Sequence, residues 1–182
     1  LQEVGCNLVM IGHSERRHVF METDEMERLK VRCALDHGFQ VLLCIGETEE
    51  EKDAGQSYDV LERQLRIGFA DADPKKADHL WVAYEPVWAI GVNGKPITID
   101  YADEMLTFIR KALGSIFSEK GEDIPILYGG SVNSGNAIPL SHCKDINGLF
   151  IGRSAWEADN FNRIIRMVLS DRQKEALGHC FC

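Results

Sequence analysis

Basic clusters and long apolar runs are what this sequence lacks. Its 20 lysines and arginines stand against 29 aspartates and glutamates, a formal charge of -9, and nowhere do they form a block. Nucleic-acid surfaces need a basic stripe, so that class of partner is excluded. No apolar stretch reaches the roughly 20 residues that cross a bilayer, and no charged-then-apolar leader opens the chain. We therefore expect a cytoplasmic protein without a membrane partner.

A disulfide framework is also missing, although the chain has six cysteines. Four lie in or beside apolar runs and are interpreted as reduced core residues: Cys6, Cys33, Cys44 and Cys143. Cys180 and Cys182 beside His179 resemble a metal-ligand cluster, but a second cluster at zinc-site spacing is lacking. We expect neither a metal nor a cofactor, and we interpret residues 171–182 as an exposed tail.

Short apolar runs alternate with amphipathic segments, a pattern that predicts an α/β protein. Each run is apolar throughout, as in strands of a parallel sheet that is covered on both faces. The five predicted strands are Leu8 to Ile11, Val41 to Ile45, Leu80 to Tyr84, Ile124 to Tyr128 and Leu149 to Ile151. A chain of 182 residues is long enough for one domain with a substantial core.

Helices are predicted between the strands from apolar residues at helical spacing. The first has a capping-box-like start at Asp24 and Glu27 and ends at Gly38. The stripes are Met26, Leu29 and Cys33; Tyr58, Leu61 and Leu65; Leu106, Ile109, Leu113 and Phe117; and Phe161, Ile164, Ile165, Val168 and Leu169.

Repeated β/α units leave two architectures, an open doubly wound sheet and a TIM (β/α)8 barrel. No glycine-rich dinucleotide turn follows the first strand, and candidate chemistry follows several strand ends, which favours the barrel. A closed barrel needs eight strands, whereas five are predicted. We therefore interpret residues 1–182 as the C-terminal five β/α units of a single barrel domain, whose first strands are outside this sequence or cleaved.

Two polar side chains just past strand ends indicate acid–base chemistry. Glu85 follows the run Leu80 to Tyr84 and precedes a bulky apolar segment that begins at Pro86. Exclusion of water by that segment would raise the pKa of the carboxyl group, as proton abstraction from carbon requires. His13 follows the strand Leu8 to Ile11, so a base and an electrophile are both available. The alternative for Glu85 is a strand-end carboxylate that is hydrogen-bonded to nearby backbone.

Four segments in order resemble the triosephosphate isomerase family: Gly12 to Arg17, Cys44 to Glu47, Ala83 to Gly91 and Tyr128 to Asn133. The resemblance covers nearly the whole chain and corresponds to strands four to eight of the family barrel. It implies an aldose–ketose isomerase that interconverts small ketose and aldose phosphates through an enediolate, as a homodimer. Glu85 is then the base and His13 the neutral electrophile, a pairing for which triosephosphate isomerase is itself the standard example.

The resemblance also implies a mobile lid from Pro86 to Pro96 that closes over a phosphate and excludes water. Its residues include Pro86, Val87, Trp88, Ala89, Ile90 and Lys95. Backbone N–H groups of Gly91, Ser131 and Gly152 would bind the substrate phosphate, which reconciles an anionic substrate with an acidic chain.

Three charged residues beside His13 are given supporting roles by the same resemblance. Glu15 falls at a supporting position near the site. Arg16 and Arg17 are interpreted as structural, paired with carboxylates such as Glu47.

The lid and the last strand depart from the usual family pattern. Triosephosphate isomerases usually continue the lid as Gly-Thr-Gly-Lys, whereas this chain has the longer Gly91-Val92-Asn93-Gly94-Lys95-Pro96. Gly152 is followed by Arg153 instead of glycine, and its side chain either leaves the phosphate pocket or adds a phosphate contact. Both features resemble isomerases of four-carbon ketose phosphates. The expected substrate is therefore erythrulose phosphate or dihydroxyacetone phosphate with glyceraldehyde 3-phosphate.

Two other functions stay open. Schiff-base aldolases also use barrels and sugar phosphates, but they need a lysine at a strand end, and the nearest lysine here is Lys95 in the lid. The chain could instead be an inactive fragment, or a partial barrel completed by another subunit, with open strand edges.

Overall fold

The structure, a computed structural model, describes residues 1–91 and 94–178, with the backbone alone for residues 175–178. The strands are β1 (Leu8–Ile11), β2 (Gln40–Ile45), β3 (Leu80–Tyr84), β4 (Ile126–Gly129) and β5 (Gly148–Phe150). The helices are α1 (Ser14–His18), α2 (Asp24–Asp36), α3 (Glu49–Asp53), α4 (Ser57–Gly68), α5 (Ile99–Phe117), α6 (Ala137–Ser141) and α7 (Ala158–Gly178). Short 3-10 segments are η1 (Gln2–Val4), η2 (Pro74–His79), η3 (Val87–Ala89), η4 (Ser118–Glu122) and η5 (Arg153–Ala155). Within the described ranges, no helix is both long and apolar enough to cross a membrane.

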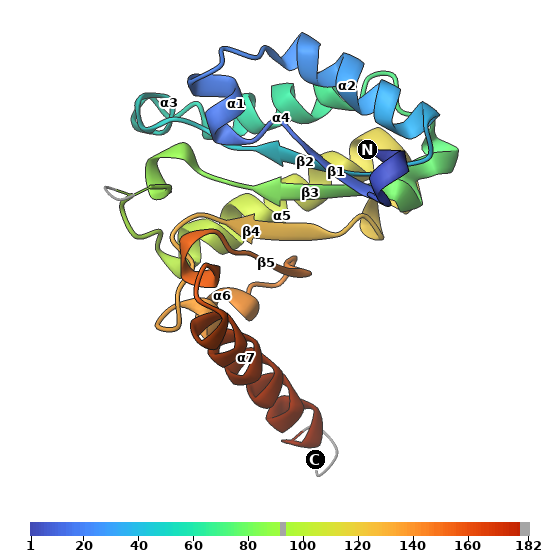
Figure 1. Cartoon of the computed structure of the whole chain (residues 1–182). Helices are drawn as coiled ribbons and strands as arrows, with labels where there is room; N and C mark the ends of the chain where they lie inside the picture. The colour runs from blue at the N-terminus through green and yellow to red at the C-terminus, as the bar shows by residue number, and fades with distance from the viewer. Residues whose placement is uncertain (92–93, 179–182) are drawn as a thin grey trace.

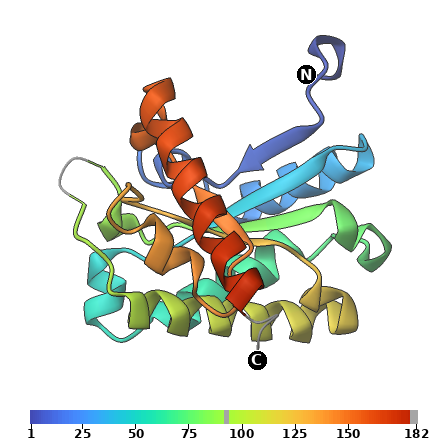
Figure 2. The ribbon, with the colours of Figure 1, turned by 90° about the horizontal axis from the view of Figure 1, so that it is seen from below.

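The five strands form one parallel sheet in the order β1-β2-β3-β4-β5, the same as their order in the chain. Figures 1 and 2 show α2, α4 and α5 together on one face of this sheet. Right-handed crossovers between successive neighbours place every helix on the same face, whereas a doubly wound sheet reverses direction and covers both faces. The architecture is therefore that of five consecutive β/α units of a (β/α)8 barrel, as predicted.

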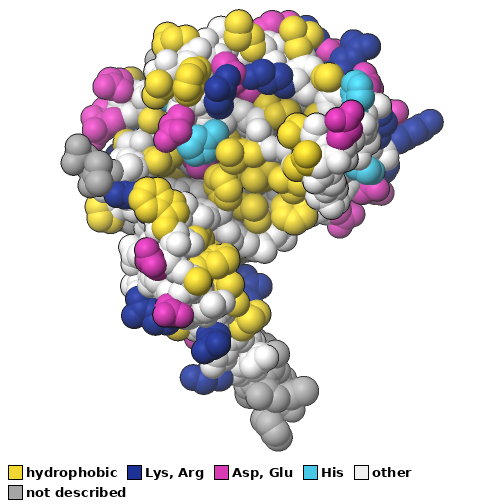
Figure 3. Space-filling model, in the orientation of Figure 1, with side chains coloured by type: hydrophobic (Ala, Val, Ile, Leu, Met, Phe, Trp, Pro, Cys, Tyr) yellow, Lys and Arg dark blue, Asp and Glu magenta, His cyan; other side chains and the backbone are white. Residues whose placement is uncertain are grey.

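Side chains alternate between the two faces of the sheet. Leu42, Cys44 and Ala83 form a small buried cluster on the face away from the helices. Figure 3 shows apolar side chains gathered in the middle of the face that is turned toward the viewer. On the edge strand β1, Met10 exposes 48% of its surface. Because no described helix lies over this face, the helix side holds the larger core.

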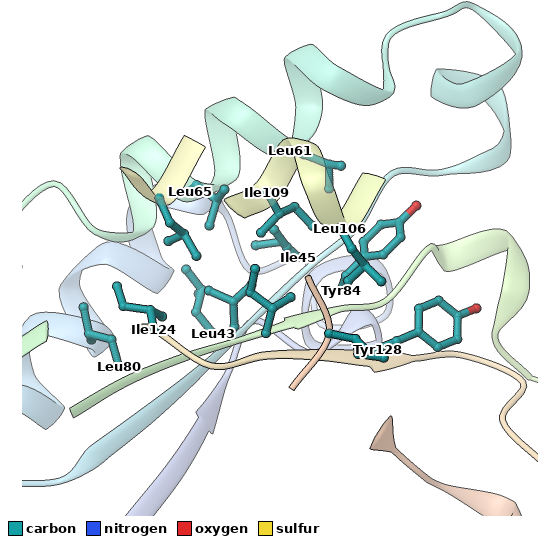
Figure 4. Packing of buried hydrophobic residues seen from close by; sticks show 14 of the residues in the cluster. Leu43, Ile45, Leu61, Leu65, Leu80, Tyr84, Leu106, Ile109, Ile124 and Tyr128 are labelled. Carbon is teal, nitrogen blue, oxygen red and sulfur yellow. The ribbon is translucent and has the colours of Figure 1, made fainter. Parts of the chain in front are cut away.

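The main core lies between the sheet and the helices. Leu43 and Ile45 of β2 point toward Leu61 and Leu65 of α4, and Ile109 of α5 packs beside them (Figure 4). All five side chains are buried. Burial of whole Leu and Ile side chains contributes about 1.5–3 kcal/mol each before entropy is subtracted. This layer holds the strand ends, where the polar residues lie, in fixed positions.

All five predicted strands are present, but the bounds of three of them differ from the prediction: β2 begins at Gln40, β5 is Gly148–Phe150, and β4 is Ile126–Gly129. The late start of β4 is due to Pro125. The predicted strand from Ile124 begins instead at Ile126. Pro125 has no N–H to give to a ladder, although its carbonyl accepts from the N–H of Val82 at 2.9 Å. The N–H of Ile126 donates to Oδ1 of Asn147 at 2.8 Å, so a side chain completes the start of β4.

Helix α2 is present, but two details of its prediction were wrong. Its N-cap is Thr23, whose side chain accepts from the N–H of Met26 at 3.3 Å, and not Asp24. The predicted stripe is turned to solvent, since Met26, Leu29 and Cys33 are exposed. The buried face carries Val31 and Leu35 instead. Two apolar faces occur on this helix, and periodicity does not say which one the sheet covers.

The cysteine interpretation holds for half of the four residues. Cys44 and Cys143 are buried free thiols, as predicted. Cys6 and Cys33 are exposed, so their assignment to the core was wrong. Cys6 lies between η1 and β1, and Cys33 lies on the solvent side of α2.

Helix α7 forms where its apolar spacing predicted and extends away from the sheet in Figure 1. Of its predicted apolar face, Ile164 is buried, whereas Phe161, Ile165 and Leu169 are exposed. The helix includes residues 171–178 of the predicted tail. His179, Cys180 and Cys182 lie outside the described residues, so the structure does not bear on that cluster.

Candidate active site

Predicted site residues follow the carboxyl ends of four strands, and a further glutamate, Glu47, follows the remaining one. His13 follows β1, Glu47 follows β2, Glu85 follows β3, Ser131 follows β4 and Arg153 follows β5. Because the strands are parallel, these ends meet at one edge of the sheet, on the left of Figure 1, where the lid also lies. This edge is where barrel enzymes build their active sites.

His13 and Glu85 lie face to face. Nε2 of His13 is 3.6 Å from Oε1 of Glu85. His13 is also the N-cap of α1, and its Nδ1 accepts from the N–H of Glu15 at 3.3 Å. An accepting Nδ1 carries no proton, so in the neutral ring the proton is on Nε2, the nitrogen that faces Glu85. The backbone of Glu15 therefore fixes the tautomer.

Glu85 has the surroundings of a poised base. It is only 5% exposed, and burial raises the pKa of its carboxyl group. His13, the thiol of Cys44 and Arg17 oppose that shift. Within the described residues, Oε2 of Glu85 has no hydrogen-bond partner. The alternative of a carboxylate satisfied by backbone is therefore wrong, and one oxygen is left for a substrate.

Gly129 leaves the space that the Glu85 side chain fills. A Cβ atom at Gly129 would lie 2.8 Å from Cγ of Glu85 and 3.0 Å from Cδ1 of Phe150. Any larger residue at the end of β4 would displace the carboxylate. The glycine is thus required by the position of Glu85.

Arg17 ties the His13 loop to the neighbouring strand. Its Nε donates to the carbonyl of Gly12 at 2.7 Å, and its Nη2 donates to the carbonyl of Cys44 at 3.1 Å. Its Nη1 pairs with Asp24 at 2.6 Å. These bonds fix the ends of β1 and β2 together, directly behind His13 and Glu85.

Both arginines pair with carboxylates, as predicted, but Glu47, named as an example, is not the partner of either within the described residues. Arg17 pairs with Asp24, and Arg16 pairs with Glu22. Glu47 is inaccessible to solvent, with aromatic donors around it instead of a guanidinium group. A cation at that position would have to displace buried rings.

Glu47 anchors the lid through one oxygen. Its Oε1 accepts from Tyr84 at 3.1 Å, from Nε1 of Trp88 at 2.9 Å and from Tyr101 at 3.0 Å. Burial raises the pKa of this carboxyl group, and the three donors oppose the shift. Trp88 belongs to the predicted lid, so the amino end of the lid is fastened to the end of β2.

Further contacts describe how the lid lies in this conformation. The N–H of Val87 donates to the carbonyl of Glu47 at 2.9 Å, and the hydroxyl of Ser131 donates to the carbonyl of Ala89 at 2.8 Å. Lys95 pairs with Glu49 at the start of α3. The lid residues Val92 and Asn93 are outside the described part of the chain.

The residues expected at the phosphate gather around the lid. Arg153 donates from Nη2 to the carbonyl of Gly91, which joins the end of β5 to the middle of the lid. Gly152, beside it, is exposed and has open space where a Cβ would stand. Ser131 approaches the same segment through Ala89. The structure thus brings Gly91, Ser131, Gly152 and Arg153 toward one end of the site.

Sequence reasoning missed three residues that shape the site: Cys44, Gln64 and the role of Glu47. Glu47 carries the same signal as Glu85, a carboxylate just past a buried strand. Cys44 alternates with core residues along β2, which places its thiol on the face where Glu85 lies. Gln64 carries no signal of this kind, because it comes from the middle of helix α4.

Comparison with known proteins agrees with this geometry. Residues 1–168 match the sequence model of the triosephosphate isomerase family. The chain belongs to this family. It is 43% identical over 171 residues to the triosephosphate isomerase of Lawsonia intracellularis, covering 94% of this chain and 68% of that protein. It is 46% identical over 169 residues to the L-erythrulose-1-phosphate isomerase of Rhizobium etli, covering 92% of this chain and 62% of that protein.

A second L-erythrulose-1-phosphate isomerase, from Mesorhizobium japonicum, is 46% identical over 167 residues, which are 91% of this chain and 64% of that protein. Relatives with both names therefore match at similar identity. The chain spans about two thirds of the length of these relatives.

Proposed function

We propose that this chain provides the base, the electrophile and the lid of an aldose–ketose isomerase that acts on small sugar phosphates. The observation that carries the proposal is the approach of Nε2 of His13 to Oε1 of Glu85 at 3.6 Å, with Nδ1 of His13 held by the N–H of Glu15. A base and a hydrogen-bond donor on the same side of a bound substrate can move a proton between adjacent carbons.

The proposed reaction begins with transfer of a proton from the carbon beside the carbonyl group to Glu85. The electron pair of the broken C–H bond forms the C=C bond of an enediolate, and the carbonyl oxygen takes the negative charge. The Nε2–H of His13 donates to that oxygen and stabilises the charge. The proton held by Glu85 then returns to the neighbouring carbon, and a hydroxyl proton moves between the two oxygens. Nothing is oxidised overall, and no cofactor is needed.

Burial gives Glu85 its strength as a base. A carboxylate whose pKa is raised by burial holds a proton more tightly than an exposed one, so it is a stronger base. Closure of the segment around Trp88 and Ile90 would remove the remaining water. Exclusion of water also protects an enediolate from loss of phosphate.

The phosphate of the substrate is proposed to bind backbone N–H groups of Gly91, Ser131, Gly152 and Arg153. Backbone amides bind an anion without net positive charge, which suits a chain with a formal charge of -9. The guanidinium group of Arg153 lies beside Gly91, so it can exchange the lid carbonyl for a phosphate oxygen when substrate arrives.

We propose a four-carbon ketose phosphate as the preferred substrate. Two L-erythrulose-1-phosphate isomerases are 46% identical to this chain, and the Arg153 side chain lies beside Gly91 at the proposed phosphate end of the site. One extra hydroxymethylene group in a fitted pocket is worth about 1–3 kcal/mol, so the preference over dihydroxyacetone phosphate should be on the order of tens to hundreds-fold in kcat/KM.

Side-by-side kinetics with erythrulose 1-phosphate and dihydroxyacetone phosphate test both parts of this proposal. Replacement of Gly91 to Lys95 by the shorter family sequence, together with Arg153→Gly, should move the preference toward the three-carbon substrate. A parent protein that prefers dihydroxyacetone phosphate would overturn the four-carbon assignment and leave the proton-transfer mechanism intact. A parent protein that converts neither compound would overturn both.

We further propose that the protein works as a homodimer in the cytoplasm. The turn between α1 and α2 supports an interface, because Val19, Phe20 and Met21 are adjacent, apolar and well exposed. Contiguous exposed apolar residues often mark a surface that contacts another protein. Light scattering of Phe20→Lys against the parent protein tests this: a dimeric parent and a monomeric variant are expected, and a monomeric parent would contradict it.

A further inference from the structure

Gln64 holds the backbone at the end of β2 with both ends of its carboxamide group. Its Oε1 accepts from the N–H of Gly46 at 2.8 Å, and its Nε2 donates to the carbonyl of Gly46 at 3.3 Å. Gln64 comes from the buried face of α4 and is 5% exposed. One side chain therefore satisfies both backbone groups of a single buried residue.

Gly46 needs such a partner because it lies beyond the last residue pair of the β2–β3 ladder. The last pair of the β2–β3 ladder is Ile45 with Tyr84. A buried N–H or carbonyl without a partner costs about 1–3 kcal/mol, so the residue after the ladder must be satisfied from elsewhere. The carboxamide of Gln64 acts there like one more peptide of a neighbouring strand.

The Gly46 peptide in turn lies directly against the backbone of Glu85. A Cβ atom at Gly46 would be 2.0 Å from the carbonyl oxygen of Glu85 and 3.1 Å from the nitrogen of Pro86. The next residue, Glu47, accepts at its carbonyl from the N–H of Val87 at 2.9 Å. The segment held by Gln64 is thus the support for both Glu85 and the first residues of the lid.

We propose that Gln64 is a positioning residue of the isomerase site. It fixes the Gly46 peptide, the peptide fixes the main chain of Glu85, and the carboxylate is thereby kept 3.6 Å from Nε2 of His13. The hydrogen bonds of the Gln64 side chain go to the backbone of Gly46, so it acts through backbone. The inference rests on the proposed isomerase function.

A matched control exists at the opposite edge of the sheet. Oδ1 of Asn147 accepts from the N–H of Ile126 at 2.8 Å and from Nη2 of Arg110 at 3.0 Å, at the amino end of β4. Both Gln64 and Asn147 thus complete the backbone of a strand end with a carboxamide. Only Gln64 does so beside Glu85.

The first test compares steady-state kinetics of Gln64→Met and Asn147→Ala with the parent protein. A shift of about 1 Å in a reacting group costs roughly a hundredfold in rate. For Gln64→Met we expect kcat to fall tenfold to a hundredfold with KM changed by less than about threefold, and for Asn147→Ala we expect kcat near the parent value. A Gln64→Met protein with parental kcat would overturn the inference.

Gln64→Glu gives a more specific test, and it replaces Gln64→Met if that variant does not fold. The introduced carboxyl group accepts from the N–H of Gly46 in either state, but it donates to the carbonyl of Gly46 only when it is protonated. The rate of Gln64→Glu relative to the parent should therefore rise as pH falls from 8 to 5. A ratio that stays constant over this range contradicts a positioning role, because loss of stability alone gives no such recovery.

Amide hydrogen exchange separates this inference from the proposed function. If the parent protein converts neither ketose phosphate, the function fails, but the backbone argument is still measurable. Gln64→Met should speed exchange at the amides of Gly46, Glu85 and Val87, and Asn147→Ala should not. Equal exchange at these three amides in all proteins would overturn the positioning role whatever the activity.

Discussion

Glu47 and Glu85 follow neighbouring strands, and both are buried carboxylates with pKa values raised by burial. They differ in what surrounds them. Oε1 of Glu47 accepts from Tyr84, Trp88 and Tyr101. Glu85 faces His13 at 3.6 Å and the thiol of Cys44.

The difference separates a structural carboxylate from a chemical one. Three donors that converge on one oxygen hold Glu47 in a single position. Their hydrogen bonds stabilise the ionised carboxylate and so make it a weaker base. Oε2 has no hydrogen-bond partner among the described residues in either glutamate, so the difference lies in what faces the other oxygen. Burial alone therefore does not identify a base, whereas burial together with an imidazole 3.6 Å from the carboxylate makes Glu85 the candidate.

Substitutions of these two glutamates have the largest effects that we predict, one on the rate and the other on stability. Glu85→Gln should lower kcat by about 10²–10⁴-fold and leave the free energy of unfolding no lower, because only the proton acceptor is removed. Glu47→Leu should instead destabilise the fold by roughly 1–3 kcal/mol or more, because three buried donors lose their acceptor. Urea unfolding and turnover of both variants check this. Comparable losses of kcat in the two variants would break the comparison.

His13→Gln should lower kcat about a hundredfold while the fold is kept, because the donor to the developing oxyanion is displaced. His79→Gln, in η2 at the other end of β3, is the control and should turn over like the parent. Rates measured with saturating ketose phosphate decide the outcome. Full activity of His13→Gln would contradict the proposal that His13 donates to the developing oxyanion.

Glu27 extends the comparison to a third buried carboxylate. It is inaccessible to solvent, neither oxygen has a hydrogen-bond partner within the described ranges, and burial raises its pKa against the opposing charges of Arg17 and Lys30. The charge of Glu22 adds to the rise.

A raised pKa in the folded state means that this group favours folding most when it is protonated. That contribution is complete below the unfolded pKa of about 4.3 and is lost as pH rises through the folded value. Glu27→Met should therefore stabilise the protein by on the order of 1 kcal/mol at pH 7, and the gain should shrink toward zero below pH 4. Urea unfolding at both pH values measures it. A gain that does not depend on pH would show that the pKa of Glu27 is the same in the folded and the unfolded protein.

Lys95→Met should have the smallest effect. Its ion pair with Glu49 is exposed, and exposed pairs contribute little. We expect kcat and KM within about fivefold of the parent, with any change reduced further in high salt. A hundredfold loss of kcat would mean that the Lys95 end of the lid controls its closure, and not the hydrogen bond between Trp88 and Glu47.

Much of the fold was predictable because each strand is a short apolar run with clear borders. The start of β4 was not, because it depends on Pro125 and on the Asn147 side chain 21 residues away. The buried face of α2 was also missed. That helix has apolar residues on two sides, and its packing against the sheet decides between them.

The approach of His13 to Glu85 follows from the sequence, because both residues follow strand ends and parallel strands bring such ends together. Their roles as electrophile and base stay predictions. The role of Glu47 could not be predicted, since its donors come from β3, the lid and α5, and Tyr101 is 54 residues away. Gln64 was missed for the same reason. Hydrogen bonds to backbone from a distant helix leave no local pattern in a sequence.

Solvent hydrogen exchange at the substrate carbon tests the central claim most directly. In deuterium oxide the parent protein should replace one hydrogen on the carbon beside the carbonyl group of its ketose phosphate, with a single stereochemistry, and Glu47→Gln should still do so. Glu85→Gln should exchange at least about a hundredfold more slowly. Exchange in Glu85→Gln at the parent rate would show that another group takes the proton, and it would contradict the assignment of Glu85 as the base.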